Sequence, residues 1–415
     1  MHKSIRKKLK LNNKQKTLFA QHAGYSRWCY NWGLSLWNAA YKDGYKPNGR
    51  RLREVFTNHT KPLYPWMKNL SSKVYQYAFI NLGEAFKRFF QGLGKYPRFK
   101  KKGRSDSFTI DNCGKPIELN GWNHKLPFLG LIKTYEPIEV TTQKITISRQ
   151  VGDWYISCNY EFTPTPNPKT TDVVGVDLGV KTLASLSDGK VFKSVKPLQR
   201  FEAKLSRQQY INRNKIIGSA NWKKAQLKLA RLHRKVANIR KDAIHKLTTT
   251  IAKNHGSVVI EDLNVSGMLQ KRCDPATTSV ARERAPRHHK LAKSIADQGF
   301  YEFRRQLKYK TQWYGSELVV VDRFFPSTKT CSNCSHVQEM PLNLRTYECG
   351  SCGISIDRDL NASINLRKRV LIGEVSVSSG PGTGTECKTH STDAVGLTVD
   401  ACGRSAADSS GGSRK

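Results

Sequence analysis

The chain has 415 residues, 38% of them hydrophobic and 10% aromatic, which is enough for two or three domains with buried cores. It carries 71 Lys and Arg against 32 Asp and Glu, a net charge of +39. This excess indicates a polyanionic partner, above all nucleic acid, rather than a merely solvated basic surface. No run of about 18 apolar residues is present, which argues against a membrane protein. The basic N-terminus lacks the apolar stretch of a secretory signal, so we expect a cytoplasmic protein.

The first part of the chain predicts two helices. Apolar and aromatic side chains recur at spacings of three and four over residues 12–42, and again from Ser71 or Ser72 to Phe89. We expect Pro97 to end the second helix. Its outer face is expected to be basic and aromatic, with Lys73, Tyr77, Lys87, Arg88 and Phe90.

A dense basic run follows the second helix. Such runs are usually solvated loops, but here Tyr96, Phe99 and Phe108 are interleaved with the cations. Aromatic rings can stack on bases while cations bind phosphates, so we expect this run to contact nucleic acid. The candidate residues are Arg98, Lys100, Lys101, Lys102 and Arg104.

Between residues 105 and 163 the apolar residues recur at every second position instead of every third or fourth. This predicts a small β unit, with a barrel as one possible arrangement. Gly152 and Asp153 are expected to form a hairpin turn there. The proline-rich segment 163–169 predicts a stiff linker and a domain boundary.

After this linker the pattern predicts three strands, a helical stretch with a long apolar seam, and a fourth strand. A helix from Ile295 to Trp313, a fifth strand and the cysteine-rich segment follow. The tail from about Gly373 is rich in Gly and Ser and predicts disorder.

Four cysteines form two CxxC pairs, which predict a metal site rather than disulfides in a chain without an export signal. Four thiolates close a tetrahedral site for one zinc ion, and a site with no open position is structural. The predicted ligands are Cys331, Cys334, Cys349 and Cys352.

Three acids predict a second metal site. Asp177 lies in the apolar strand "VVGVDLGV", Glu261 ends "SVVIED", and Asp357 or Asp359 opens the last helix. Buried acids are costly unless they are paired or bind a cation. Oxygen ligands suit Mg²⁺, and two such ions can clamp a phosphodiester during in-line displacement. The order of elements is that of the ribonuclease H architecture, in which these acids would meet at one sheet edge.

The last helix is expected to separate two neighbouring aspartates. Asp357 and Asp359 differ by about 200° around a helix axis, so both cannot face the same metals. Asp359 shares a face with Ala362, Ser363 and Leu366, small or apolar residues suited to packing on the sheet. Asp357 is suited to capping the helix N-terminus.

Four motifs in order resemble the RuvC nuclease and zinc ribbon of TnpB proteins, which insertion sequences encode and which are relatives of compact type V CRISPR effectors. They are "GVDLGVKTLASLSDG", "VVIEDLNVSGM", "FPSTKTCSNC" and "CGISIDRDLNASINL", and the resemblance covers roughly residues 1–372. It implies an RNA-guided DNA endonuclease that binds a transposon-derived guide RNA and double-stranded target DNA and reads a short motif beside the target. Matched residue by residue, it makes Asp177, Glu261 and Asp359 the catalytic acids.

The resemblance also implies a multidomain α+β fold. A β-barrel wedge domain carries a helical recognition insertion, and a ribonuclease H-like (RuvC) α/β domain carries the zinc ribbon. The expected bounds are 1–10 and 100–165 for the wedge, 11–99 for the recognition domain, 170–326 and 356–372 for the nuclease, 197–253 for its helical insertion, 327–355 for the zinc ribbon and 373–415 for the tail.

Two other functions remain open on the sequence. Ribonuclease H folds also host transposases that join DNA strands, although the position of the zinc ribbon favours the guided nuclease. A nucleic-acid-binding regulator with a vestigial nuclease fold is disfavoured because all three acids are present. The oligomeric state is undetermined, with a monomer on RNA as the expectation.

Overall fold

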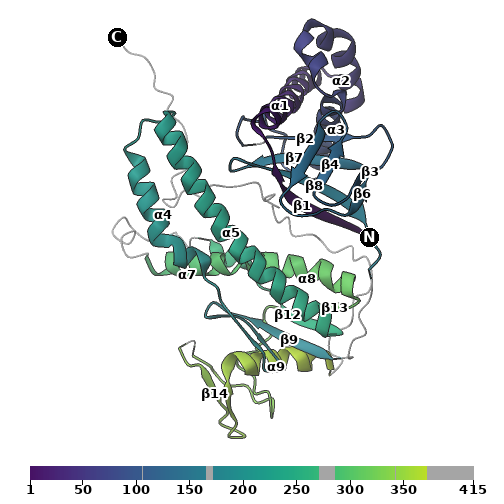
Figure 1. Cartoon of the computed structure of the whole chain (residues 1–415). Helices are drawn as coiled ribbons and strands as arrows, with labels where there is room; N and C mark the ends of the chain where they lie inside the picture. Colours follow the sequence, from purple (N-terminus) through teal and green to yellow (C-terminus); the bar gives the residue numbers. More distant parts are fainter. Residues whose placement is uncertain (105, 165–171, 271–285, 342, 372–415) are drawn as a thin grey trace. The chain divides into compact units, whose positions relative to one another are not determined.

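The computed structural model describes residues 1–104, 106–164, 172–270, 286–341 and 343–371, with residues 286–290 described by their backbone alone. Contacts divide them into two compact units, Met1–Phe162 and the described part of Thr163–Thr383 (Figure 1). The expected linker, apart from residues 163 and 164, and the expected disordered tail lie outside the described residues. Within those residues, no helix is both long and apolar enough to cross a membrane.

The described residues of the first unit form eight strands: β1 His2–Lys10, β2 Ser107–Asp111, β3 Ile117–Leu119, β4 Asn123–Leu126, β5 Gly130–Thr134, β6 Val140–Thr142, β7 Lys144–Gln150 and β8 Asp153–Glu161. Six of them make one sheet in the order β2-β7-β8-β1-β5-β4, and β3 pairs with β6. The N-terminal strand β1 thus lies between β8 and β5. The hairpin turn is Val151-Gly152, both at positive φ, because Gln150 pairs with Asp153. The turn predicted at Gly152-Asp153 was one residue late.

Helices cover this sheet: α1 Asn13–Lys42, α2 Gly49–Val55, η1 Phe56–Thr60, η2 Lys61–Leu63, η3 Pro65–Asn69 and α3 Ser72–Phe90. The first predicted helix is confirmed, and Asn12 and Gln15 form a capping box at its start. Helix α3 ends at Phe90, seven residues before Pro97, and Gln91 is its cap residue, so the prediction that Pro97 ends it was wrong. Backbone bonds from Gln91 to the last turn close the helix without proline.

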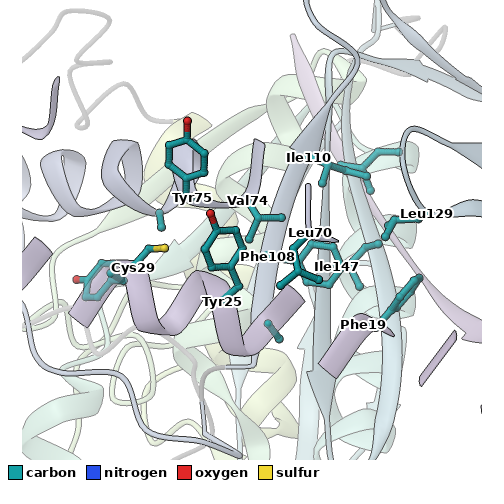
Figure 2. Packing of buried hydrophobic residues seen from close by; sticks show 14 of the residues in the cluster. Phe19, Tyr25, Cys29, Leu70, Val74, Tyr75, Phe108, Ile110, Leu129 and Ile147 are labelled. Carbon is teal, nitrogen blue, oxygen red and sulfur yellow. The ribbon is translucent and has the colours of Figure 1, made fainter. Parts of the chain in front are cut away.

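Helices α1 and α3 share one core with the strands (Figure 2). Phe19 packs edge-to-face on Phe108 and Trp154, and Trp37 stacks on Phe86 with ring centroids 4.0 Å apart. Phe108, which we expected to stack on bases, is 2% exposed and belongs to this core. The period of two places it on the inner face of β2, and local sequence cannot show which face is covered.

The described residues of the second unit form strands β9 Val173–Leu178, β10 Thr182–Leu186, β11 Val191–Lys193, β12 Ser257–Glu261, β13 Glu317–Val321, β14 Thr346–Glu348 and β15 Ser355–Asp357. The first five make a sheet in the order β11-β10-β9-β12-β13. Strand β10 is antiparallel to β9 and β11, whereas β12 is parallel to both β9 and β13. Strands β14 and β15 form a separate hairpin.

The helices of this unit are α4 Pro197–Arg213, α5 Ala220–Asn254, α6 Val265–Leu269, α7 Pro286–Gln298, α8 Phe300–Tyr314 and α9 Arg358–Leu371. The single helix predicted from Ile295 to Trp313 was wrong, because the chain breaks at Gly299 with φ +73°. A side chain at Gly299 would come within 2.9 Å of Ile244. Glycine therefore allows both the left-handed turn and the close packing on α5.

Helices lie on both faces of the sheet (Figure 1). Val174 and Val176 of β9 join a core with residues of α5 and α8. On the other face, Val259 of β12 joins a core with Leu366 of α9. The second unit is therefore a helix–sheet–helix sandwich, and alternate residues of β9 and β12 face α9.

Helix α9 approaches β9 most closely at Gly175. A Cβ atom there would lie 1.9 Å from the Ser363 carbonyl oxygen and 2.7 Å from the Arg367 amide nitrogen. The helix also buries Ala362, Ser363 and Leu366, the face predicted from sequence. The glycine on β9 and the small residues on α9 together allow the two backbones to approach this closely.

We predict that Gly175→Ala displaces α9 and lowers the free energy of unfolding of the second unit by roughly 1–3 kcal/mol, because backbone atoms of α9 occupy the space of the new methyl group. Thermal unfolding measures the loss. Gly350→Ala is the matched control, since its nearest neighbour is the Gln338 side chain at 3.8 Å. A tolerated Gly175→Ala would show that α9 does not pack this closely.

Candidate active site

Two of the predicted acids lie side by side at the carboxyl edge of the sheet. Strands β9 and β12 run parallel and pair as far as Val176 with Ile260, so the next position aligns Asp177 with Glu261. Aligned residues of neighbouring strands project on the same face, and the strands lie about 4.8 Å apart. Asp177 follows Gly175 by two residues and therefore projects on the α9 face.

Helix α9 places the third acid on this face. Asp359 precedes Ser363 by one helical turn, about 6 Å along the axis, and Ser363 is the residue that packs on Gly175. Two residues of strand also advance by about 6.6 Å, from Gly175 to Asp177. Starting from the contact between Gly175 and Ser363, the strand reaches Asp177 and the helix reaches Asp359 over nearly the same distance. The two carboxylates therefore lie near each other.

The charges of the two other acids both act on Asp177. Asp177 is only partly exposed and closely surrounded by protein atoms, and burial followed by the charges of Asp359 and Glu261 raises its pKa to about 7. Burial and the charge of Asp262 also raise the pKa of Glu261. A divalent cation would relieve this repulsion, and three carboxylates form the all-oxygen donor set of a hard cation.

Cationic and polar groups surround Asp359. One carboxylate oxygen, Oδ1, lies 3.4 Å from Arg358 Nη2 and 3.9 Å from Arg345 Nη1. The Thr182 hydroxyl lies 3.5 Å from Oδ2. Sequence reasoning missed Thr182 and Arg345, because they come from β10 and from the cysteine-rich segment, far from Asp359 along the chain.

Asp262, next to Glu261, has a different role. Its carboxylate accepts hydrogen bonds from Arg304 of α8 and from Arg323, just beyond β13. Burial opposes ionisation, but these two bonds hold the pKa of Asp262 below its ordinary value. Asp262 therefore joins β12, α8 and the end of β13 by a charge-assisted fork, a role that the sequence did not reveal.

Asp357 caps α9, as predicted. Its Oδ1 accepts hydrogen bonds from the amides of Asp359 and Leu360, both at 3.0 Å. These are among the first free N–H groups of the helix. The two aspartates thus divide as expected: Asp357 binds the helix end, and Asp359 lies beside Asp177.

The four predicted cysteines form one cluster. Their Sγ atoms all lie within 4.8 Å of one another, with the pairs Cys331–Cys352 and Cys334–Cys349 at 3.6 Å. Tetrahedral zinc with Zn–S distances of about 2.3 Å requires sulfur atoms about 3.8 Å apart, so the arrangement fits a zinc ribbon. Within the described residues, this is the one such cluster of three or more His, Cys, Asp or Glu side chains.

Two asparagines fasten this cysteine cluster to α9. Asn361 accepts a hydrogen bond from the Ser332 amide and donates one to the Thr330 carbonyl, each at 2.8 Å. Asn365 donates to the carbonyls of Ser327 and Thr330. Both asparagines are buried, and their role was not predicted, because a polar residue in a helix gives no signal of its distant partner.

The predicted nucleic-acid residues have unequal surroundings. Arg98, Lys101, Lys102 and Arg104 are exposed. The Lys100 ammonium lies 4.0 Å from the centroid of the Tyr30 ring, and burial lowers the pKa of Lys100 to about 8. On α3, Lys73 and Tyr77 bind Asp111, so part of the predicted outer face packs on β2 instead.

Family models match three parts of the chain. A model described as a probable transposase matches residues 141–272, and a Cas12f1-like TNB domain matches residues 300–366. A helix-turn-helix domain matches residues 1–46, where the structure has strand β1 and the single helix α1. The last description therefore does not fit the local structure of this chain.

The chain is 34% identical over 364 residues to a protein of Escherichia coli strain K12 named RNA-guided DNA endonuclease InsQ, covering 86% of this chain and 90% of that one. The chain belongs to the TnpB family. A Streptomyces pristinaespiralis member, also named an RNA-guided DNA endonuclease, is 36% identical over 343 residues, covering 77% of this chain and 78% of the relative.

One solved structure has a similar fold. The chain resembles Cas12f1 in a cryo-EM structure of its complex with sgRNA and target DNA, with a TM-score of 0.52 and 15% identity. The match covers 86% of this chain and 83% of Cas12f1. The fold is therefore Cas12f-like: mixed α/β, multidomain and with a zinc-ribbon-like TNB domain.

We predict that Asp177→Asn stabilises the metal-free protein at pH 8 more than at pH 5. Its pKa rises from 3.8 to about 7 on folding, so the stability that this carboxyl contributes is fully present below pH 3.8 and is lost as the pH rises through 7. The stabilisation by Asp177→Asn should be roughly 1–2 kcal/mol greater at pH 8 than at pH 5. This is less than the full 1.36 kcal/mol for each unit of pKa shift, because the sheet edge around Asp177 is partly hydrated.

Thermal unfolding in EDTA at both pH values measures this difference. Asp172→Asn is the control, since Asp172 precedes the same strand and is exposed. Equal stabilisation at both pH values would contradict the raised pKa of Asp177.

We also predict that the purified protein holds one zinc ion per chain and that Cys331→Ser releases it. Loss of zinc should lower the unfolding temperature, because structural zinc contributes on the order of 10 kcal/mol to its domain. Elemental analysis and thermal unfolding measure the two effects. Cys113→Ser, at an exposed cysteine outside the cluster, should change neither, and full zinc content in Cys331→Ser would refute the ligand set.

Proposed function

We propose that this protein is an RNA-guided DNA endonuclease. Asp177, Glu261 and Asp359 would bind two Mg²⁺ ions that catalyse the hydrolysis of DNA. One observation carries the proposal: the two strand acids align at one sheet edge, and α9 brings Asp359 to the same face. The named activity of its relatives and its net charge of +39 support a complex with guide RNA and target DNA.

The strand order supports a RuvC-like, ribonuclease H-type nuclease domain. Three antiparallel strands are extended by two parallel ones, and the acids come from β9, β12 and α9. Magnesium, when bound, would activate water and neutralise charge on the phosphodiester. The three acids would hold the ions, and the burial of Asp177 would exclude part of the water that otherwise screens their charges.

The first unit provides the proposed wedge and recognition parts. The sheet that joins β1 to β2–β8 corresponds to the wedge, and the helices α1–α3 correspond to the recognition insertion. We propose that the exposed basic run Arg98, Lys101, Lys102 and Arg104 contributes phosphate contacts there. Lys100, lying over Tyr30, would instead position this run. Base pairing with the guide would supply the sequence specificity.

We predict that, with its cognate guide RNA and Mg²⁺, the protein cuts matching double-stranded DNA and that Asp359→Ala abolishes cutting. Asp357→Ala should retain cutting and lower the stability of α9 by about 1 kcal/mol, because only a helix cap is lost. Gel assays of guided cleavage, with EDTA as the metal-free control, measure the first effect, and thermal unfolding measures the second.

Guide-RNA binding should be unchanged in Asp359→Ala, which separates loss of chemistry from loss of assembly. Strand-transfer products made without RNA would instead indicate a transposase. Nucleic-acid binding without any magnesium-dependent cutting would indicate a regulator.

A further inference from the structure

A long helical arm projects from the second unit (Figure 1). The arm comprises α4, the turn at residues 214–219 and α5 as far as Val236. The sheet-facing core that α5 shares with β9 and β12 begins only at Ile244, so the arm packs outside that core. Helix α4 has 17 residues, so the arm extends by about 25 Å.

The arm begins at the edge of the sheet that carries the acids. Strand β11 is antiparallel to β10, as β9 is, and Lys193 pairs with Thr182, so β11 ends at the same edge as β9. Helix α4 follows β11 directly. Helix α5 returns to the opposite edge, where β12 begins. The base of the arm and the acids therefore lie at the same edge of the sheet.

A buried aspartate fixes the base of the arm. Asp297 Oδ2 accepts hydrogen bonds from the amides of Leu198 and Gln199 at the start of α4, at 2.8 and 3.3 Å. Its Oδ1 pairs with Arg240 of α5 at 2.8 Å. Asp297 is 5% exposed, so one carboxylate ties both helices of the arm to α7. The direction of the arm is thereby set.

The arm is strongly basic. Residues 197–236 include 11 Lys and Arg and one acidic residue. Such a surface favours a polyanion and disfavours a second copy of itself. The exposed cations of the arm are Arg200, Lys204, Arg207, Arg213, Lys223, Lys224, Lys228, Arg231 and Lys235.

The tip of the arm is apolar. Ile216 and Ile217 are 81% and 83% exposed. The turn that presents them is ordered, because the Ser219 amide donates to the Ile216 carbonyl and the Ser219 hydroxyl caps α5 at Trp222. Exposed isoleucines between basic helices match the apolar wedges with which proteins unstack base steps.

We propose that the arm binds target DNA, with its cations on phosphates and Ile216 and Ile217 wedged against an opened base step. The inference rests on the proposed function, because the strand to be cut, and not the guide RNA, must reach the acid edge. The wedge would stabilise unpaired target DNA, the state that pairing with a guide requires.

The test uses the full chain with its guide RNA in the Asp359→Ala background, so that binding is measured without cutting. Two targets are compared: an intact duplex and the same sequence with a pre-opened, mismatched segment. Ile216→Ser with Ile217→Ser should weaken binding to the intact duplex by about tenfold, the size of one lost base-stacking contact. On the pre-opened target the loss should be under about twofold, because opening is no longer required.

Val191→Ser, which removes an exposed aliphatic side chain elsewhere in the same unit, is the matched control and should behave like the parent on both targets. Equal affinities of the tip variant and the parent on the intact duplex would overturn the inference. So would weaker guide-RNA binding, or a lower unfolding temperature without nucleic acid, which would assign the tip to RNA or to the protein itself.

The phosphate contacts are tested by Lys223→Gln, Lys224→Gln and Lys228→Gln together. The slope of log affinity for duplex DNA against log salt should become shallower by about 2.7, at 0.9 per phosphate contact. An unchanged slope would overturn this part of the inference. Failure of the proposed function is distinguishable, because the protein with all its native acids would then not cut guided DNA at all.

Discussion

Helix α9 can reach the strand that carries Asp177 only because that strand has glycine at position 175. The Ser363 carbonyl occupies the space where a Cβ would lie, and one turn earlier the same helix presents Asp359. The geometry of the acid site is therefore set by backbone contact, which is stiffer than a contact between flexible side chains. The alignment of Glu261 with Asp177 depends in turn on the parallel pairing of β9 with β12.

The cysteine cluster acts on the same helix. Asn361 and Asn365 bind the backbone of the first cysteine turn, and Asp357 caps the helix from the end of β15. The ribbon therefore restrains α9 along its buried side and at its N-terminus, next to Asp359. Together these restraints hold like charges close together, an arrangement that a bound cation would stabilise.

Much of this arrangement was predictable from the sequence. Periodicity and turn chemistry depend on neighbours within a few residues, so most helices and strands were predicted correctly, among them α1, α3 and the strand pairs joined by hairpins. The CxxC spacing and the acids at two strand ends and one helix start are equally local signals. They predicted which residues meet, and the different roles of Asp357 and Asp359 followed from helix geometry together with the family resemblance.

What the sequence by itself determined was the list of elements and chemically capable residues; their partners were decided only by the tertiary structure. Phe108 belongs to the core and Lys100 lies over Tyr30 because α1 packs near their segment, a contact between residues about 70 or more positions apart. Asn361 and Asp262 acquired their roles in the same way. Such contacts depend on how distant segments pack, and no local periodicity records that packing.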